Sequence, residues 1–202
     1  MLIGRSLRSL VLPCAALLIL AGPAVAQRSA SQFVDATRAS SEPAATACPG
    51  ERHRASDYAI GEWVGTVKIP EADGTLRVDT TVTSEARLET AADGCALVEW
   101  RVVRRDGRDP THIITVRAYD PESGRWHQFL ASSRPALIRF RGEIAGGDLR
   151  FVAPRAGGDG SEDLVRVTDR RIDGTGFDRV IESSENGGRS WVLEDVVEYR
   201  SP

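Results

Sequence analysis

From Glu62 onward, apolar and polar residues alternate with a period of two along most of the chain. This alternation is typical of strands that have one buried face and one solvent-facing side. In the last run, the alternation predicts one shared face for Trp191, Leu193, Val197 and Tyr199, and Asp195 interrupts it. The pattern predicts about ten strands, at residues 62–69, 76–90, 95–104, 112–119, 125–132, 136–143, 148–153, 163–172, 176–183 and 190–200.

The connections between these runs are short and rich in Gly, Pro, Asp and Asn. Links of this length join neighbouring antiparallel strands and leave no room for crossover helices. A meander of about ten strands predicts an all-β protein, an up-and-down antiparallel barrel whose closure removes exposed sheet edges. The one helical segment that we expect is a turn or two within 53–61, where it would plug a mouth of the barrel.

The first 26 residues have the pattern of a secretory signal peptide. Arg5 and Arg8 precede an apolar stretch at 10–21, and Ala24-Val25-Ala26 forms a small-x-small ending. A membrane anchor needs about 20 apolar residues, whereas this stretch is shorter and is broken by Pro13. We therefore expect cleavage after Ala26, no stable membrane anchor, and a periplasmic or secreted protein.

Composition divides the remaining chain into two parts. Residues 27–47 are rich in Ala, Ser and Thr and predict a flexible leader, whereas 48–202 form the barrel domain. The formal net charge is −3, and it becomes −5 when Arg5 and Arg8 are removed with the signal peptide. An acidic domain without a basic stripe argues against nucleic acid as a partner.

Two cysteines, Cys48 and Cys95, remain after the signal peptide is removed. An even pair in an oxidising compartment predicts a disulfide, which would join the segment before the first strand to the barrel. The alternative is a metal site that also uses His53, but the recognised ligand spacing of zinc sites is missing. We expect the disulfide and no metal.

Three motifs give the chain a family resemblance. They are Gly61-Glu62-Trp63, Tyr119-Asp120-Pro121 followed by Trp126, and the run SENGGRSW from Ser184 to Trp191. The first is similar to the G-x-W opener of calycin-type barrels, which include lipocalins, fatty-acid-binding proteins and nitrobindin-like proteins. Together they resemble an uncharacterised family of exported bacterial barrel domains of unknown function. The resemblance implies a calycin-like barrel over roughly 48–200 and says little about activity.

Catalytic and cofactor motifs are missing from the sequence. It contains no nucleophile elbow, no zinc-protease helix motif, no phosphate-binding loop and no dinucleotide fingerprint. The nitrobindin-like resemblance invites haem, but no histidine follows His127 to serve as a proximal ligand. The acidic glycine-rich loop at 157–163 has oxygen ligands for calcium, but such a loop is more often simply mobile. We expect no cofactor.

Arginines beside aromatic residues are the main candidates for ligand binding. Arg117 and Tyr119 have the Arg-x-Tyr form that resembles the carboxylate clamp of fatty-acid-binding barrels, and Arg179 follows Phe177 at the same spacing. An inward guanidinium needs an acidic side chain or an anionic ligand. The alternative is that these arginines face outward and pair across strands with an acid such as Glu99, Glu182 or Glu194.

The leading hypothesis is therefore an exported barrel that binds a small hydrophobic or amphipathic ligand, which is anionic if the arginines face it. The predicted ligand-binding residues are Trp63, Trp100, Arg117, Tyr119, Trp126, Arg179 and Trp191.

Two alternatives remain. The first is an enzyme that uses His127 or His112 with a carboxylate such as Glu99, inside the barrel. The second is an envelope interaction module without a pocket, which an exposed apolar patch outside the barrel would favour. The sequence gives no prediction of the oligomeric state.

Overall fold

The computed structural model describes residues 48, 50–134, 136–155, 163–172 and 175–202. The predicted signal peptide, its cleavage site and the leader at 27–47 lie outside the described residues, as does most of the loop at 157–163. All of the described residues belong to one compact unit.

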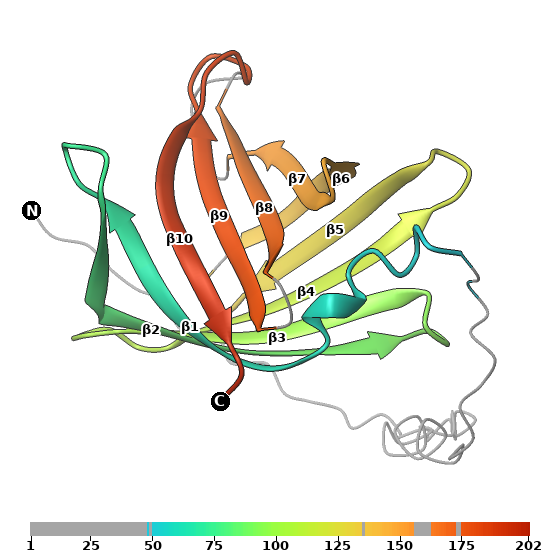
Figure 1. The fold of residues 1–202 in the computed structure, drawn as a ribbon, viewed down its shortest axis with the longest axis horizontal. Helices are drawn as coiled ribbons and strands as arrows, with labels where there is room; N and C mark the ends of the chain where they lie inside the picture. Colours follow the sequence, from blue (N-terminus) through green and yellow to red (C-terminus); the bar gives the residue numbers. More distant parts are fainter. Residues whose placement is uncertain (1–47, 49, 135, 156–162, 173–174) are drawn as a thin grey trace, which may run out of the picture. The chain divides into compact units, whose positions relative to one another are not determined.

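Ten strands form one closed antiparallel barrel, in which each strand pairs with the next and β1 pairs with β10 (Figure 1). The all-β, up-and-down antiparallel barrel predicted from the alternation is confirmed. Each observed strand overlaps its predicted range, and β5 has the predicted bounds. The strands are β1 (Gly61–Pro70), β2 (Leu76–Ala91), β3 (Ala96–Arg105), β4 (Thr111–Asp120), β5 (Arg125–Ser132), β6 (Ala136–Ala145), β7 (Asp148–Pro154), β8 (Leu164–Ile172), β9 (Gly176–Ser184) and β10 (Val192–Arg200).

A short 3-10 helix, η1 (Asp57–Ala59), precedes β1 and closes one end of the barrel, as expected. Ala59 is fully buried, and its carbonyl oxygen accepts a 2.8 Å hydrogen bond from Trp63 Nε1. The Trp63 ring meets the Phe177 ring edge-on at 5.4 Å between centroids, and Tyr58 meets the same ring at 6.1 Å. Aromatic contacts of this kind seal what we call the closed end.

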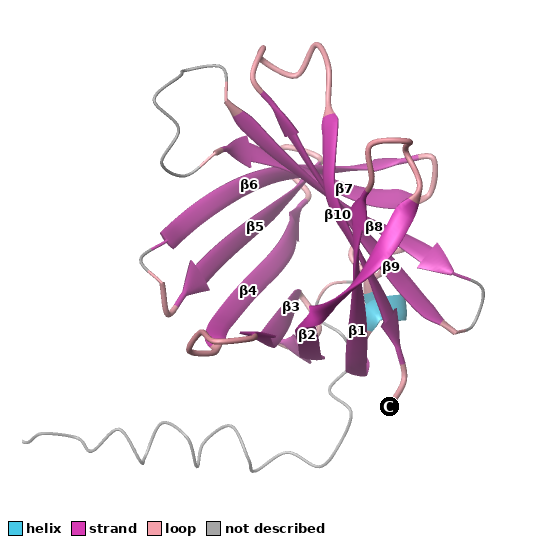
Figure 2. Cartoon of the chain, turned by 90° about the vertical axis from the view of Figure 1, so that its left-hand side faces the viewer, coloured by secondary structure: helices cyan, strands magenta, loops and turns pink. Residues whose placement is uncertain are grey.

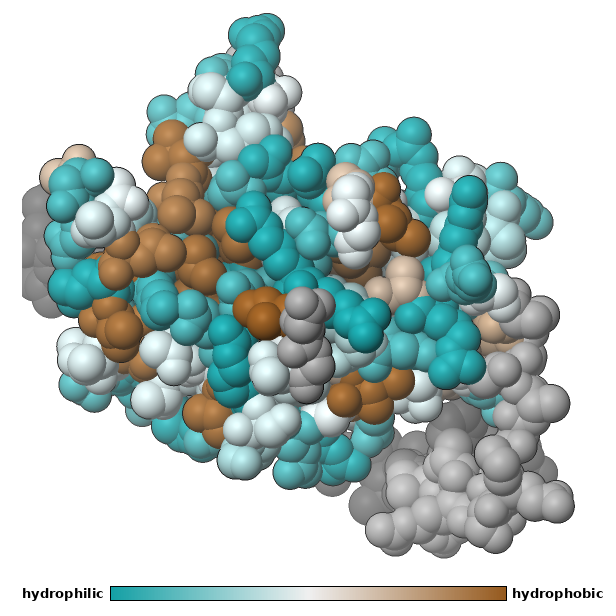
Figure 3. Space-filling view, in the orientation of Figure 1, coloured by the Kyte–Doolittle hydropathy of each residue, from teal (hydrophilic) through white to brown (hydrophobic). Residues whose placement is uncertain are grey.

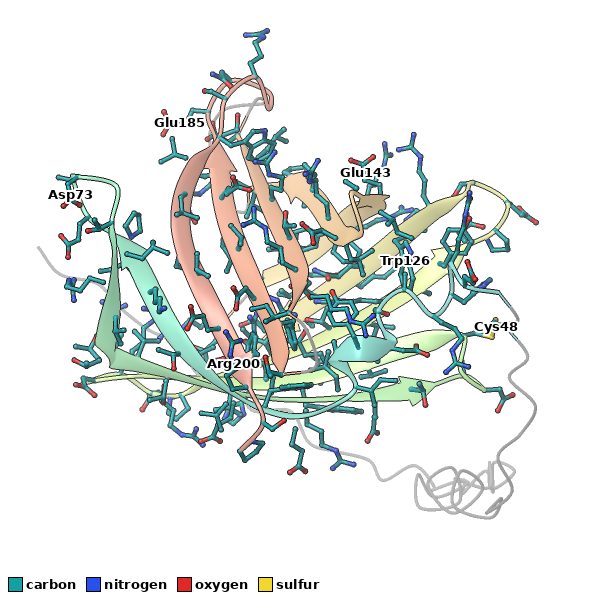
Figure 4. The ribbon with its side chains drawn as sticks, in the orientation of Figure 1. Cys48, Asp73, Trp126, Glu143, Glu185 and Arg200 are labelled. Carbon is teal, nitrogen blue, oxygen red and sulfur yellow. A yellow bond between two sulfur atoms is a disulfide. The ribbon has the colours of Figure 1, made fainter. Side chains whose placement is uncertain are left out.

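The predicted disulfide between Cys48 and Cys95 is confirmed, with 5.1 Å between the two Cα atoms (Figure 4). Cys95 lies in the turn between β2 and β3, so the bond ties the segment before η1 to that hairpin. In the chain-entropy model, closing a loop of this length stabilises the fold by roughly 4 kcal/mol.

The hairpin between β9 and β10 is organised by its own side chains. Ser184 Oγ accepts hydrogen bonds from the backbone amides of Asn186 and Gly188 at 3.3 and 2.9 Å. Asn186 in turn holds Ser190 through both its amide oxygen and its amide nitrogen. The Ser-x-Asn-x-Gly motif is thus a turn device, and the structure gives it no catalytic geometry.

Side chains fill most of the closed half of the lumen. Phe140, Phe151 and Trp126 pack together, and Gly142 on β6 makes room for two of these rings. A Cβ at Gly142 would lie 2.5 Å from the Phe151 ring and 2.9 Å from Trp126 Cβ. In the view of the barrel's side in Figure 2, β4, β5 and β6 lie next to one another. No helix in the described ranges is long and apolar enough to cross a bilayer.

Candidate functional site

Two of the predicted arginines face into the barrel and lie in a buried ionic cluster. Arg117 on β4 and Arg179 on β9 are 1% and 2% exposed. Between them lie Glu99 of β3 and Asp169 of β8, which are equally buried. We call these four residues the ionic quartet.

Every guanidinium in the quartet has carboxylate partners. Arg179 donates to both Asp169 oxygens at 2.8 and 3.0 Å and to both Glu99 oxygens at 2.6 and 3.1 Å. Arg117 donates to Asp169 at 2.7 Å, to Glu99 at 3.3 Å and to the Gln128 amide oxygen at 2.8 Å. The quartet contains two positive and two negative charges in hydrogen-bonded contact, and this contact offsets the free-energy cost of burying them.

The quartet holds its carboxylates ionised. Burial opposes ionisation of Glu99, but the charges of Arg179, Arg101 and Arg117 outweigh burial and lower its pKa to about 2. Burial likewise opposes ionisation of Asp169, and the two quartet arginines again prevail and lower its pKa. The same attraction raises the pKa of Arg179 against its own burial. The quartet is therefore a fixed, internally neutral group at all ordinary pH values.

This arrangement changes the role expected for Arg117 and Arg179. The alternative in which they face outward is wrong, although one acid named for that pairing, Glu99, is indeed their partner inside the barrel. Because their donors are satisfied by protein oxygens, they lack the free guanidinium that a carboxylate clamp needs. The quartet is therefore a structural layer of paired charged side chains that crosses the lumen.

An open cavity of about 250 Å³ lies in the lumen at the end away from η1. We call it the lumen cavity. Six of its twelve lining residues are aliphatic and six are polar, and the polar ones include three arginines and one aspartate. The lining residues are Val67, Val82, Ser84, Arg101, Val103, Arg105, Thr111, Ile113, Arg134, Ile181, Asp195 and Val197.

Two lining residues hold buried polar atoms without a hydrogen-bond partner among the described residues. They are Arg101 Nε and Asp195 Oδ1. Arg101 is 11% exposed at its side chain and lies next to the quartet, with 3.6 Å between its Nε and Glu99 Oε1. Burying a polar group without a partner costs about 1–3 kcal/mol, so such atoms mark a place where a partner is missing.

Asp195 points into the cavity on the same face of β10 as Val197 and Tyr199, and a β-bulge directly precedes it. In the pairing of β10 with β9, Leu193 pairs with Glu182 and Asp195 pairs with Ile181, so one extra residue stands between them. Bulges reorient side chains and are frequent beside functional sites. The cavity wall next to the bulge therefore includes a carboxyl group, in a lining that is half aliphatic and half polar.

The position of Asp195 changes its ionisation. Burial raises its pKa to about 6, although the charges of Arg101 and Arg105 act in the opposite direction. The charged groups around the quartet and the inner part of the cavity thus comprise three guanidiniums, of Arg101, Arg117 and Arg179, and three carboxyls, of Glu99, Asp169 and Asp195, of which Asp195 alone has a raised pKa. Protonation of Asp195 consequently leaves the interior with one excess positive charge.

The mouth of the lumen cavity is basic. Arg105, at the end of β3, and Arg134, in the connection between β5 and β6, are exposed and line its rim. Exposed positive charge around a concave site attracts an anionic or polar ligand and raises the rate of encounter.

The predicted aromatic residues lie away from this cavity. Trp63, Trp126 and Tyr119 face inward at the closed end, where Trp126 is 2% exposed. Tyr119 is covered by the segment before η1, since its hydroxyl accepts a hydrogen bond from Arg52 and its ring meets His53 edge-on. These three residues are placed to close the barrel.

Trp100 and Trp191 lie outside the barrel, so the prediction that they line its interior is wrong. Trp100 is between the inward-facing Glu99 and Arg101 on β3, and it is 41% exposed. Trp191 precedes β10 and lies beneath the guanidinium of Arg166, 4.1 Å from the ring centroid to Cζ. Alternation along a strand does not show whether an aromatic residue faces the inside or the outside of the barrel. For this reason the sequence alone placed Trp100 and Trp191 on the wrong side.

The two histidines of the enzymatic alternative, His112 and His127, are also outside the barrel. His112 is exposed, and His127 lies on the outer face of β5, between the inward-facing Trp126 and Gln128, with its Nε2 3.8 Å from Asp120 Oδ2. The enzymatic alternative required a histidine and Glu99 to meet inside the barrel, and the structure contradicts it. Among the described residues, no group of three metal-ligating side chains lies together.

The residues that the sequence interpretation missed are Arg101 and Asp195. Asp195 carried a signal, because it interrupts an apolar face. Arg101 falls on the same inward face of β3 as Glu99, which becomes informative only once the direction of that face is known.

No family model matches the chain, and no curated protein matches it. Among solved structures, the chain is similar to the S-type phycobiliprotein lyase CPES from Guillardia theta, with 10% identity, 72% of this chain and 89% of that chain covered, and a TM-score of 0.47. It is also similar to a protein of unknown function of the DUF3598 family from Nostoc punctiforme, with 12% identity, 76% of this chain and all of that chain covered, and a TM-score of 0.24.

Proposed function

We propose that this chain is an exported binding protein that holds one small amphipathic ligand in the lumen cavity. Export, through the signal peptide expected at 1–26 and to the periplasm or the cell exterior, is part of the proposal. The disulfide supports it, because such bonds persist in oxidising compartments.

The single observation that carries the proposal is the pair of unsatisfied atoms in the cavity wall. Arg101 Nε is a donor that needs an acceptor, and Asp195 Oδ1 is an acceptor that needs a donor. A ligand head group that both accepts and donates, such as an amide or a carboxylic acid, satisfies the two atoms together. The aliphatic side chains of Val67, Val82 and Ile181 then pack against the ligand's apolar part.

The size of the cavity limits the ligand. Its volume of about 250 Å³ is near the lower end of the range for small-molecule pockets, and the ionic quartet prevents extension toward the closed end. We therefore propose a short-chain or single-ring ligand, and we exclude a long extended lipid from the interior.

Calorimetric titration of the purified protein with octanamide tests this proposal. We expect saturable binding at one site per chain. Val103→Trp fills the cavity wall and should weaken binding at least about tenfold, whereas Thr83→Trp, on the outward face of the adjacent strand, should leave it unchanged. Equal binding by both variants, or no binding of octanamide and octanoate by the unmodified protein, would overturn the proposal.

A further inference from the structure

The outside of the barrel contains an open cleft at β5, β6 and β7, away from the lumen site. Its volume is about 370 Å³, and the turn between β4 and β5 forms one edge of it. Figure 4 labels one lining residue, Glu143, beside the hairpin of β6 and β7. The lining residues are Ser123, Gly124, Arg125, Arg141, Gly142, Glu143, Arg150 and Val152. We call this site the basic cleft.

Three guanidinium groups from three neighbouring strands surround the basic cleft. Arg125 is on β5, Arg141 on β6 and Arg150 on β7, and all three alternate with buried residues that face the lumen. Glu143, which is opposite Arg150 in the register, is the one acidic residue in the lining. Three positive charges and one negative charge give the cleft a formal charge of +2.

These arginines lack partners that would satisfy their donors. Among the described residues, the side chains of Arg125 and Arg141 form no hydrogen bond, ion pair or ring contact. Arg150 Nη1 is 3.8 Å from Glu143 Oε1, which is too far for a hydrogen bond, and its Nε is buried without a hydrogen-bond partner in the described part of the chain. A buried donor without an acceptor is costly, so the cleft is a place where an acceptor is missing.

The nearest other carboxylate does not supply that acceptor. Asp120 pairs with Arg125 in the register of β4 and β5, but its oxygens are engaged within their own turn. They accept hydrogen bonds from the Glu122 amide at 3.0 Å and from Ser123 Oγ at 2.6 Å. The turn thus keeps this carboxylate for itself, and the positive charge of the cleft remains in excess.

The excess does not follow simply from the many arginines of the chain. Several outward arginines elsewhere on the barrel have an acidic partner within 3.2 Å; they are Arg104 with Glu85, Arg166 with Glu182, and Arg200 with Asp178. The face shown in Figure 3 has apolar patches separated by hydrophilic residues, which is ordinary for a protein surface. The basic cleft differs from such a surface because it gathers three arginines around one hollow.

We infer that the basic cleft binds the dianionic phosphoryl group of a phosphate monoester. Guanidinium groups match the oxygens of phosphate in paired hydrogen bonds, and these charge-assisted bonds are strong. A phosphate monoester carries about −1.5 to −2 charges at neutral pH, which balances the formal charge of the cleft. A sulfate ester or a phosphodiester carries one negative charge and would leave the cleft positive. The inference is independent of the lumen site.

The size of the basic cleft indicates that the phosphoryl group belongs to a larger molecule. Small-molecule pockets usually measure about 300–1,000 Å³, and the cleft, at about 370 Å³, lies within that range. It therefore has room for a small organic part beside the phosphoryl group, such as one sugar ring.

Titrations with glucose 6-phosphate and with inorganic phosphate at pH 7, followed by proton–nitrogen NMR, test the inference. The Nε–H signal of Arg150 and the backbone amide signals of Ser123 and Gly124 should shift and saturate together. The amide signals of Arg105 and Arg134, at the mouth of the lumen cavity, should not shift. Glucose 6-sulfate, which carries a single charge, should bind at least about tenfold more weakly than glucose 6-phosphate.

Substitutions within one strand provide the matched comparison. Arg141→Gln should weaken glucose 6-phosphate binding at least about tenfold. Arg139→Gln removes the same charge from the same face of β6, but Arg139 lies outside the cleft and stacks on Phe129. Its effect should be less than about twofold at physiological ionic strength, where charges are screened over about 8 Å. Glu143→Gln removes the acidic residue of the lining and should strengthen binding at least about twofold.

Vesicle co-sedimentation distinguishes the two sources of a phosphate monoester. Phosphatidic acid carries a monoester, whereas phosphatidylglycerol carries a diester. Binding of glucose 6-phosphate supports a soluble ester. Binding only to phosphatidylcholine vesicles that contain phosphatidic acid, lost in Arg141→Gln and not seen with phosphatidylglycerol, supports a lipid ester.

Four outcomes would overturn the inference. The first is no binding of glucose 6-phosphate, inorganic phosphate or phosphatidic acid vesicles. The second is equal affinity for glucose 6-sulfate and glucose 6-phosphate. The third is an equal loss of binding in Arg141→Gln and Arg139→Gln, which would indicate a diffuse effect of net charge. The fourth is a set of shifted signals confined to Arg105 and Arg134, which would place the phosphate at the lumen cavity.

Discussion

Arg101 Nε and Asp195 Oδ1 line one cavity, are both buried, and both lack a hydrogen-bond partner within the described part of the chain. The other interior charges, those of the ionic quartet, are fully paired. Arg101 is in ionic contact with Glu99 at 3.6 Å but lacks a hydrogen bond at Nε, and Trp126 Nε1 at the closed end is likewise buried without a hydrogen-bond partner among the described residues. What distinguishes Arg101 and Asp195 is that both line the lumen cavity. Retaining unsatisfied groups at a cost in stability is a frequent property of binding sites.

The free-energy cost of burying the ionised Asp195 carboxylate can be measured directly. Its folded-state pKa of about 6 lies above the ordinary value of 3.8, so Asp195 favours the folded state at low pH. That contribution is lost as the pH rises from about 4 through 6. Asp195→Asn should therefore raise the free energy of unfolding at pH 8 by up to roughly 3 kcal/mol and should change it little at pH 4. Urea unfolding at several pH values measures the difference, and a variant that is less stable than the parent at pH 8 would contradict the assignment.

Ligand binding should depend on pH according to the ligand's head group. A carboxylate needs the proton of Asp195, so octanoate affinity should fall by about tenfold for each pH unit above 6 until the ionised site's own affinity is reached. Octanamide donates to Asp195 Oδ1, so its affinity should not fall over the same range. Calorimetric titrations at pH 6, 7 and 8 compare the two ligands. In the Asp195→Asn variant, octanoate affinity should no longer depend on pH over this range. If the pH dependence persists, the proton belongs to another group.

The ionic quartet should dominate the electrostatic contribution to stability. Glu99→Gln leaves Arg179 and Arg117 with uncompensated buried charge and should cost about 3–5 kcal/mol. Glu85→Gln breaks an exposed ion pair with Arg104, in which both side chains are about half exposed, and should cost less than about 1 kcal/mol. Denaturant unfolding of both variants provides the comparison. Similar costs for the two would mean that the quartet is not the closed, dry group that its geometry describes.

Loss of the disulfide should affect stability and leave the lumen cavity intact. The double variant Cys48→Ser with Cys95→Ser should lower the free energy of unfolding by roughly 4 kcal/mol, because the unfolded chain regains the freedom of the loop. Octanamide affinity should remain that of the parent, since the cavity is at the opposite end from η1. A large loss of affinity in a variant that stays folded would show that the two ends are coupled.

The fold could be predicted because its signals are local. Period-two alternation and short Gly- and Asp-rich turns decide strands and hairpins without knowledge of distant contacts, and Trp63 after Gly61 indicated a sealed end. The pairing of Cys48 with Cys95 followed from their number and their expected compartment.

The site could be predicted only in part because its contacts cross the lumen. Arg117 and Arg179 were correctly selected, but their partners Glu99 and Asp169 come from distant strands, so the sequence could not show that their donors are satisfied. Asp195 was visible as an interruption of the apolar face that it shares with Val197 and Tyr199, but only the closed barrel shows that this face lines a cavity. An alternating pattern fixes which residues share a face and leaves open which face is inside, and for that reason Trp100 was misplaced.

A crystal structure of the protein with octanamide tests the central claim most directly. The account predicts one ligand in the lumen cavity, with its carbonyl oxygen within hydrogen-bond distance of Arg101 Nε and its amide nitrogen within hydrogen-bond distance of Asp195 Oδ1. A ligand bound only on the outside of the barrel near Trp100, or a lumen cavity that stays without ligand at saturating octanamide, would contradict it.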